Sequence, residues 1–253
     1  MASFVLYVHK MHLKVITKGF VNRTAHSGAV FSYTKWYSYC MSKIISLTGN
    51  MGVGKDTMAD YMVAKYGFVK VSMADPFKRI AKDVYEFSDE QLWGPSSERN
   101  KDDVRYPRAD GTYLSARIVT QLLGNDLSRL AYPETWIVYM KRVVEKIQAG
   151  YFYDEKKGVF QELGKKSEYA GIIVSSCRFQ NEIEAIKEMG GIAVRLVRKA
   201  LSVEGFLTTG LQNHITETEQ LALSDDFFDY AVEVPEGKEA FYHVIDGFME
   251  KVW

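Results

Sequence analysis

The chain has 253 residues, of which 47% are hydrophobic and 25% charged, so it can bury a substantial core and is not disordered throughout. Its 32 basic and 32 acidic residues balance, which excludes a global electric field that would recruit nucleic acid or an anionic membrane. Charged residues or glycines interrupt every apolar stretch, which excludes the run of roughly 18 apolar residues that a membrane-spanning helix needs. A small-molecule partner is therefore favoured, with no nucleic acid and no membrane.

The two cysteines, Cys40 and Cys177, lie far apart and not at metal-ligand spacing. We therefore expect two free thiols and a reducing, cytoplasmic location. Residues 1–40 contain no Asp or Glu, a composition that resembles a transit peptide, and an upstream leader before Met41 explains it equally well. We interpret residues 1–40 as an N-terminal extension and residues 41–253 as one folded domain.

From Met41 onward, short apolar runs alternate with longer stretches of helical periodicity. This alternation is typical of an α/β fold in three layers, with a mainly parallel sheet between helices. Strands are predicted at 44–48, 68–72, 171–175 and 192–197, with an edge strand at 230–234. Helices are predicted at 56–66, 75–85, 114–131, 133–149, 181–189, 216–223 and 238–252.

Two segments interrupt this pattern. Residues 88–112 are polar and charge-dense, hold Arg99, Arg105 and Arg108 together with two prolines, and are predicted to form a mobile loop or lid. Residues 150–168 are aromatic and charged without a clear period, so the sequence leaves the structure and the role of this insertion open.

A glycine-rich segment, Gly49-Asn50-Met51-Gly52-Val53-Gly54-Lys55-Asp56-Thr57, lies between a predicted strand and a predicted helix. Its glycines allow successive N–H groups to point at phosphate oxygens, and Lys55 can reach the β and γ phosphates. The positive end of the following helix also favours a polyphosphate. The segment therefore predicts a nucleoside triphosphate site, and the alternative is a glycine-rich turn with an exposed lysine.

One residue departs from the usual phosphate-loop pattern. Asp56 stands where Ser or Thr normally follows the lysine, and Thr57 comes one residue later. Asp56 could hold Mg²⁺ through water, and Thr57 could supply a hydroxyl ligand. We assign the metal role to both residues jointly.

Basic residues follow predicted strands, where the carboxyl ends of a parallel sheet form a ligand crevice. Lys78 comes after the second strand and Arg178 after the strand at 171–175. Arg117 opens a predicted helix. An isolated Arg or Lys can also be a solvated surface residue, and Arg178 could form a simple helix-start ion pair with Glu182.

Five segments resemble, in the same order, the deoxynucleoside monophosphate kinases of large tailed bacteriophages. The resemblance extends from about Met41 to the C-terminus and includes the Asp-Thr pair after the lysine, which is therefore a feature of that branch. The segments are Gly54–Thr57, Asp75–Lys78, Gln121–Asp126, Ser176–Glu182 and His214–Glu217.

The resemblance implies a P-loop NTPase fold and an ATP-dependent phosphorylation of deoxynucleoside monophosphates to diphosphates. It implies small-molecule nucleotide partners and, for a phage protein, a location in the host cytoplasm, and a homodimer is one arrangement open to the chain. ATP and Mg²⁺ would be held by Gly52, Gly54, Lys55, Asp56 and Thr57. The acceptor would be surrounded by Lys78, Arg99, Arg117, Trp136, Arg178 and Glu182, with Lys55 and Arg178 as the catalytic residues.

Some positions and functions stay open at this level. Ser176 stands where phage relatives can have an aspartate, so we leave it out of the catalytic set. For His214 and Glu217 we favour a structural role, because Thr216 and Glu219 make a capping box. The rivals are a kinase of dephospho-coenzyme A or phosphomevalonate, and a nucleotide-dependent switch ATPase. The last would need a water-positioning Gln or a Walker B aspartate, and neither is evident.

Overall fold

The computed structural model describes residues 43–50, 52–198 and 223–253. In this part of the chain, a five-stranded sheet has the order β2–β7–β1–β8–β9, and all neighbouring strands are parallel. The predicted parallel sheet is therefore confirmed, with β9 at one edge. The strands are β1 (Lys43–Thr48), β2 (Phe68–Val71), β7 (Gly171–Val174), β8 (Ile192–Val197) and β9 (Tyr230–Glu233).

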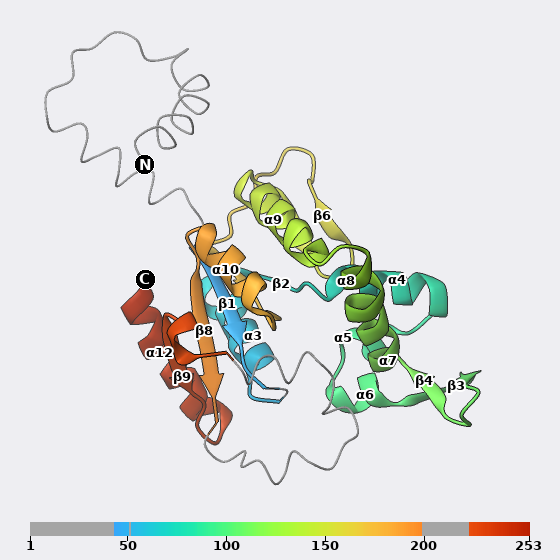
Figure 1. Cartoon of the computed structure of the whole chain (residues 1–253). Coiled ribbons are helices and arrows are strands. Elements are labelled where there is room, and N and C mark those ends of the chain that lie inside the picture. The colour runs from blue at the N-terminus through green and yellow to red at the C-terminus, as the bar shows by residue number, and fades with distance from the viewer. Residues whose placement is uncertain (1–42, 51, 199–222) are drawn as a thin grey trace, which may run out of the picture. The chain divides into compact units, whose positions relative to one another are not determined.

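Helices cover both faces of this sheet, which makes three layers (Figure 1). Successive side chains of a strand point to opposite faces, so β1 contributes Ile44 to one core and Ile45 to the other. The Ile44 core contains side chains of α9 and α10, and the Ile45 core contains side chains of α3 and α12. These helices are α3 (Lys55–Tyr66), α9 (Thr135–Gln148), α10 (Gln180–Glu188) and α12 (Lys238–Val252).

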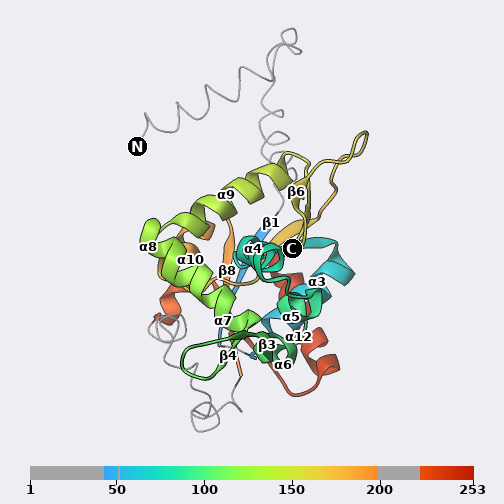
Figure 2. The ribbon, with the colours of Figure 1, turned by 90° about the vertical axis from the view of Figure 1, so that its right-hand side faces the viewer.

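A third, smaller core lies among helices on one side of the sheet and contains Ala81, Phe87, Leu92, Ala116 and Val119. Figure 2, which shows this side, has α4, α5 and α7 in front of the strands. The elements here are α4 (Asp75–Tyr85), α5 (Asp89–Trp93), α6 (Ser96–Asn100), β3 (Asp102–Pro107), β4 (Tyr113–Ser115), α7 (Ala116–Gln121), a π-helical segment (Leu122–Leu127) and α8 (Ser128–Ala131).

The prediction of a loop at 88–112 is wrong, because this stretch forms α5, α6 and the strand β3, which pairs with β4. Ser88 caps α5 in a capping box with Gln91, with bonds of 3.2 and 2.9 Å. Gln91 also donates to the buried Asp103 at 3.0 Å, and Arg105 donates to Asp103 at 2.7 Å. Polar residues that suggested a loop thus bond to one another, and Arg105 holds the pKa of Asp103 well below its usual range.

The predicted helix at 114–131 begins later and is not uniform. Ser115 caps it, accepting from the N–H of Ile118 at 3.3 Å, and its middle is π-helical. A Cβ on Gly124 would lie 2.7 Å from the Phe77 ring, so the ring packs directly on the backbone there. The carbonyl of Gly124 accepts from the Trp136 indole at 2.5 Å. This close packing accompanies the wide turn.

The insertion at 150–168 contains an antiparallel hairpin, β5 (Phe152–Asp154) with β6 (Gly158–Phe160). The Tyr153 hydroxyl donates to Asp75 of α4 at 2.7 Å. Arg79 of α4 donates to the carbonyl of Glu155 at 2.9 Å. Lys156 of the hairpin also pairs with Asp89 of α5 at 2.8 Å. The hairpin is therefore fastened to α4 and α5, which border the candidate site.

Several predictions concern residues outside the described ones: the extension 1–40, Cys40, His214 and Glu217, and the helix at 216–223 apart from Leu223. Cys177 is a free, buried thiol as predicted, and burial raises its pKa well above the usual value. None of the helices in the described part of the chain has the length and apolar character that crossing a bilayer requires.

Candidate active site

The glycine-rich loop follows β1 and leads into α3, as predicted. Gly49 has φ 145°, and a Cβ there would lie 2.7 Å from the backbone oxygen of Leu196, so any larger residue would be strained. Gly54 caps α3 with φ 116°. The glycines therefore let the chain turn tightly between the sheet and the helix, and the positive end of α3 lies at this turn.

Lys55 bends back over this loop. Its ammonium donates to the carbonyl oxygens of Gly49 at 2.5 Å and Asn50 at 2.9 Å. Phosphate oxygens in the loop would compete with these carbonyls for the ammonium, and an anion is the stronger acceptor. The lysine is thus placed for a phosphate that approaches the loop.

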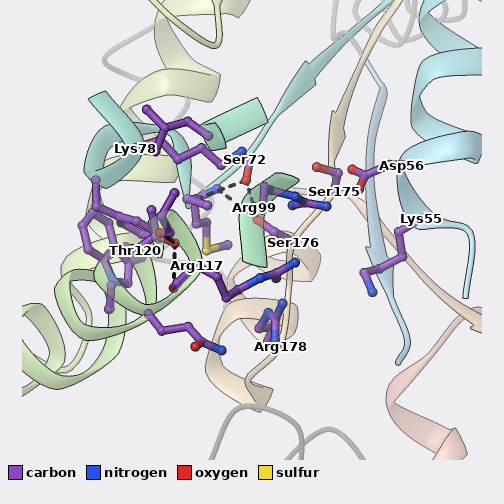
Figure 3. Close-up of a pocket in the computed structure, with 18 of the residues that line it drawn as sticks. Lys55, Asp56, Ser72, Lys78, Arg99, Arg117, Thr120, Ser175, Ser176 and Arg178 are labelled. Carbon is purple, nitrogen blue, oxygen red and sulfur yellow. Dashed lines mark hydrogen bonds between the residues drawn. The ribbon is translucent and has the colours of Figure 1, made fainter. Parts of the chain in front are cut away.

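A cavity of about 170 Å³ lies beyond the carboxyl ends of β2 and β7, between the phosphate loop and the helices of the third core. Figure 3 shows Lys55 and Asp56 on one side, with Arg117 and Arg178 facing them. Every residue predicted to surround the acceptor lines this cavity: Lys78, Arg99, Arg117, Trp136, Arg178 and Glu182. Of the residues predicted to hold ATP and Mg²⁺, Lys55 and Asp56 line it, and Gly52, Gly54 and Thr57 do not.

The arginines of the cavity come from three different elements. Arg99 lies on α6 and donates to Ser96 at 3.3 Å, and its buried Nε has no hydrogen-bond partner among the described residues. Arg117 lies on α7 and donates to Asn100 at 3.1 Å. Arg178 lies in the turn between β7 and α10. Since a buried guanidinium nitrogen without an acceptor is costly, the site is suited to an anion.

Trp136 forms an apolar wall of the cavity. Its side chain is buried, its indole N–H is bonded to Gly124, and its ring meets Phe77 edge-on at 4.9 Å between centroids. The indole N–H is therefore already engaged with the backbone. An aromatic wall of this kind suits a flat, apolar ring system.

Lys78 belongs to a buried polar group. Its Nζ lies 3.7 Å from Asp75 Oδ1, and Asp75 also accepts from the Tyr153 hydroxyl at 2.7 Å and from the N–H of Ser72 at 3.1 Å. Burial raises the pKa of Asp75 and lowers the pKa of Lys78, and the attraction between the two opposes both shifts. Tyr153 was not predicted, because it belongs to the insertion without a readable pattern.

Glu182 is 3% exposed, and its ion-pair partner is not Arg178, the partner that the sequence left open as an alternative. Its Oε2 accepts from the backbone N–H of Arg178 at 2.8 Å, and its Oε1 pairs with Arg129 at 2.5 Å. Burial raises the pKa of Glu182, and the charge of Arg129 opposes that rise. The sequence analysis gave Arg129 no role, and no local pattern connects it with Glu182, which lies 53 residues away in the chain.

Asp56 is the candidate metal ligand that the cavity exposes. Its side chain is 63% exposed, and Lys70 approaches its Oδ1 to 3.3 Å. Partial burial raises the pKa of Asp56, but the positive charges of Lys70 and Arg99 outweigh this effect. The net result is a lowered pKa, which favours the ionised carboxylate. Among the described residues, no group of three or more His, Cys, Asp or Glu could hold a metal ion. A lone carboxylate fits Mg²⁺ that takes its other ligands from phosphates and water.

Ser176 connects the ends of two strands. Its hydroxyl lies 3.0 Å from that of Ser72 and accepts from the N–H of Met73 at 3.1 Å. The side chain thus holds the turn after β2 against the turn after β7. These contacts give Ser176 a structural role at the edge of the cavity.

No protein-family model matches the chain. A protein of Acanthamoeba polyphaga mimivirus, provisionally named deoxynucleotide monophosphate kinase, is 30% identical to it over 159 residues, which are 63% of this chain and 76% of that protein. Among solved structures, dephospho-CoA kinase from Campylobacter jejuni is 14% identical, with a TM-score of 0.40 over 84% of this chain and 98% of that one. Shikimate kinase from Aquifex aeolicus is 12% identical, with a TM-score of 0.42 over 83% and 97%. Structural likenesses this low say nothing about a substrate.

Proposed function

Because the chain belongs to the family of the mimivirus deoxynucleotide monophosphate kinase, we propose that it phosphorylates deoxynucleoside monophosphates with ATP. The products would be the deoxynucleoside diphosphate and ADP. This reaction would be a step in the supply of DNA precursors. One observation carries this proposal. A single cavity has the phosphate-loop residue Lys55 on one side, and Arg117 and Arg178 facing it (Figure 3). Such a cavity fits two phosphate groups that meet at its centre.

The proposed transfer needs positioning and charge neutralisation more than covalent chemistry. An anionic phosphate oxygen of the acceptor attacks the γ-phosphorus of ATP, and the bond from that phosphorus to the β–γ bridging oxygen breaks. ADP leaves with that electron pair. The acceptor oxygen carries no proton to remove, so no general base is required, and none is assigned.

The cationic side chains divide this work. Lys55 and the N–H groups of the phosphate loop bind the β and γ phosphates of the donor. Arg117, Arg178 and Lys78 bind the acceptor phosphate, and Arg178 stabilises the charge that moves between the two in the transition state. Trp136 would provide an apolar wall for the base of the acceptor.

Asp56, with Thr57 beside it at the start of α3, would hold Mg²⁺ together with donor phosphate oxygens. When bound, this ion offsets negative charge on the β and γ phosphates. Lys70 keeps the Asp56 carboxylate ionised before any nucleotide binds. Asp56 and Thr57 therefore share the metal role in this proposal.

We expect Arg99→Ala to lower kcat/KM for the acceptor by about 10²-fold, because this guanidinium faces the cavity and has an unpaired buried nitrogen. The midpoint of thermal unfolding should change little, because among the described residues the side chain of Arg99 makes one hydrogen bond, to Ser96 at 3.3 Å. Steady-state kinetics and a melting curve measure both quantities.

α5 and α6 would form the lid that excludes water.

The matched control for Arg99→Ala is Arg108→Ala. Arg108 is exposed near the turn of the β3–β4 hairpin, where it donates to Thr112 at 3.2 Å, and it does not line the cavity. Its loss should leave kcat/KM unchanged. If Arg99→Ala lowered activity and the midpoint of thermal unfolding to the same extent, the role proposed for Arg99 in acceptor binding would be contradicted.

The acceptor itself is tested by ADP release. We expect ATP turnover to be stimulated by deoxynucleoside monophosphates and weakly or not at all by dephospho-coenzyme A or phosphomevalonate. Ribonucleotides in the same series report on the sugar. Stimulation by one of the two metabolites alone would replace the acceptor proposed here, and slow turnover that no acceptor stimulates would point to a switch ATPase.

A further inference from the structure

The buried carboxylate of Glu182 is already engaged on both oxygens. Oε2 accepts from the backbone N–H groups of Arg178 at 2.8 Å and Phe179 at 3.2 Å. Oε1 accepts from the guanidinium of Arg129 at 2.5 Å. Only 3% of the residue is exposed, so the contacts of Glu182 are with other groups of the protein. It holds the turn that leads from β7 into α10.

Arg129 is held by its guanidinium, although its buried Nε has no hydrogen-bond partner among the described residues. Its side chain is 18% exposed, and its guanidinium lies 3.4 Å from the centroid of the Phe179 ring. It therefore contacts both the carboxylate and the side chain that follows Arg178 in sequence. Stacking on an aromatic face and pairing with a carboxylate together fix a planar guanidinium in one orientation.

We infer that Arg129 is a positioning residue of the acceptor site, which acts through Glu182 to fix the turn that presents Arg178 to the cavity. Glu182 then supports the backbone of this turn, in place of the direct contact with the nucleotide that the family resemblance implies. What the cavity binds rests on the proposed function, whereas the clasp between Arg129 and Glu182 stands on its own contacts.

The clasp also joins two walls of the cavity. Arg129 lies on α8, and α8 continues from α7, which carries Arg117, through the π-helical segment. Arg178 belongs to a separate part of the lining, the turn between β7 and α10. A displacement of α7 and α8 would therefore also move the turn that carries Arg178. Arg117 and Arg178 would keep their relative position.

The first test compares Arg129→Met with Glu182→Gln by titration calorimetry. Arg129→Met should weaken deoxynucleoside monophosphate binding at least 10-fold and leave ADP binding unchanged, and Glu182→Gln should have a similar effect. The double variant should be no weaker than Arg129→Met, because both changes break one unit. Arg129→Lys should recover part of the affinity, since an ammonium can still pair with Glu182. Lost binding in Glu182→Gln with full binding in Arg129→Met would show that Glu182 contacts the nucleotide itself, and would overturn the inference.

The second test needs no substrate, so it separates this inference from the proposed function. Amide hydrogen exchange of Arg178 and Phe179 in the ligand-free protein should be at least 10-fold faster in Arg129→Met than in the wild type. Unchanged exchange overturns the inference even if the wild type is an active kinase. If the wild type binds no deoxynucleoside monophosphate, the proposed function fails and the exchange rates still decide. Should Arg129→Met not fold, Arg129→Lys and the double variant carry the same measurement.

Discussion

Replacing Lys55 with alanine is expected to lower kcat for phosphoryl transfer by about 10²- to 10³-fold. The ammonium lies over the phosphate loop, within 2.9 Å of the Asn50 carbonyl, where it can follow the charge that develops on the transferred group. Because that interaction strengthens in the transition state, kcat should fall together with kcat/KM. Steady-state ADP release at saturating ATP and acceptor measures the effect.

Lys251→Ala is the matched control for this variant, because Lys251 is an exposed lysine in the last turn of α12. Its kinetics should equal those of the wild type. Thermal unfolding of Lys55→Ala checks that the loss of the two loop contacts has not unfolded the protein. A folded Lys55→Ala protein with more than half of the wild-type kcat would contradict the role of the phosphate loop in transfer.

Asp75→Ala is expected to lower the free energy of unfolding by about 3–5 kcal/mol, the range for removing one partner of a buried pair. The change leaves Lys78 without its carboxylate, and the Tyr153 hydroxyl and the N–H of Ser72 without an acceptor. Urea denaturation measures this loss. The insertion hairpin should also detach from α4 at this point, since Tyr153 provides one of its contacts there.

Two further variants calibrate that result. Tyr153→Phe removes one hydrogen bond to the carboxylate and should cost about 1.5–3 kcal/mol. Asp83→Ala removes an exposed carboxylate from the same helix and should stay within about 0.5 kcal/mol of the wild type. A loss below about 1 kcal/mol in Asp75→Ala would mean that neither Lys78 nor the hairpin depends on this group.

The sequence was sufficient to predict the elements whose signal is local. The bounds predicted for β8, α4 and α12 agree with the structure, because an apolar run or a helical period marks each of them. The phosphate loop was predictable for the same reason. The carboxyl ends of parallel strands meet at one edge of a sheet, so Lys78 and Arg178 could be expected in one cavity, and both line it.

The roles that the sequence did not assign at the site belong to residues whose partners are distant in the chain. Tyr153 bonds Asp75 across 78 residues, and no local pattern marks a hairpin that depends on such a contact. Glu182 pairs with Arg129 across 53 residues, and the nearer Arg178 suggested a different ion pair. Tertiary packing decides which partner a buried charge takes. Sequence spacing therefore placed charged residues at the site but did not assign their roles.

The π-helical segment at Leu122–Leu127 sets the rotational phase of α8. At about 100° per residue, a regular α-helix would leave Arg129 about 120° around the axis from Arg117. One residue absorbed by the wider turn removes about 100° of that angle and brings Arg129 to within about 20° of Arg117. A chain that lacked one residue of this segment could remain helical and keep every side chain of the site. Its α8 would face another direction, and Glu182 would lose the cation that it pairs with.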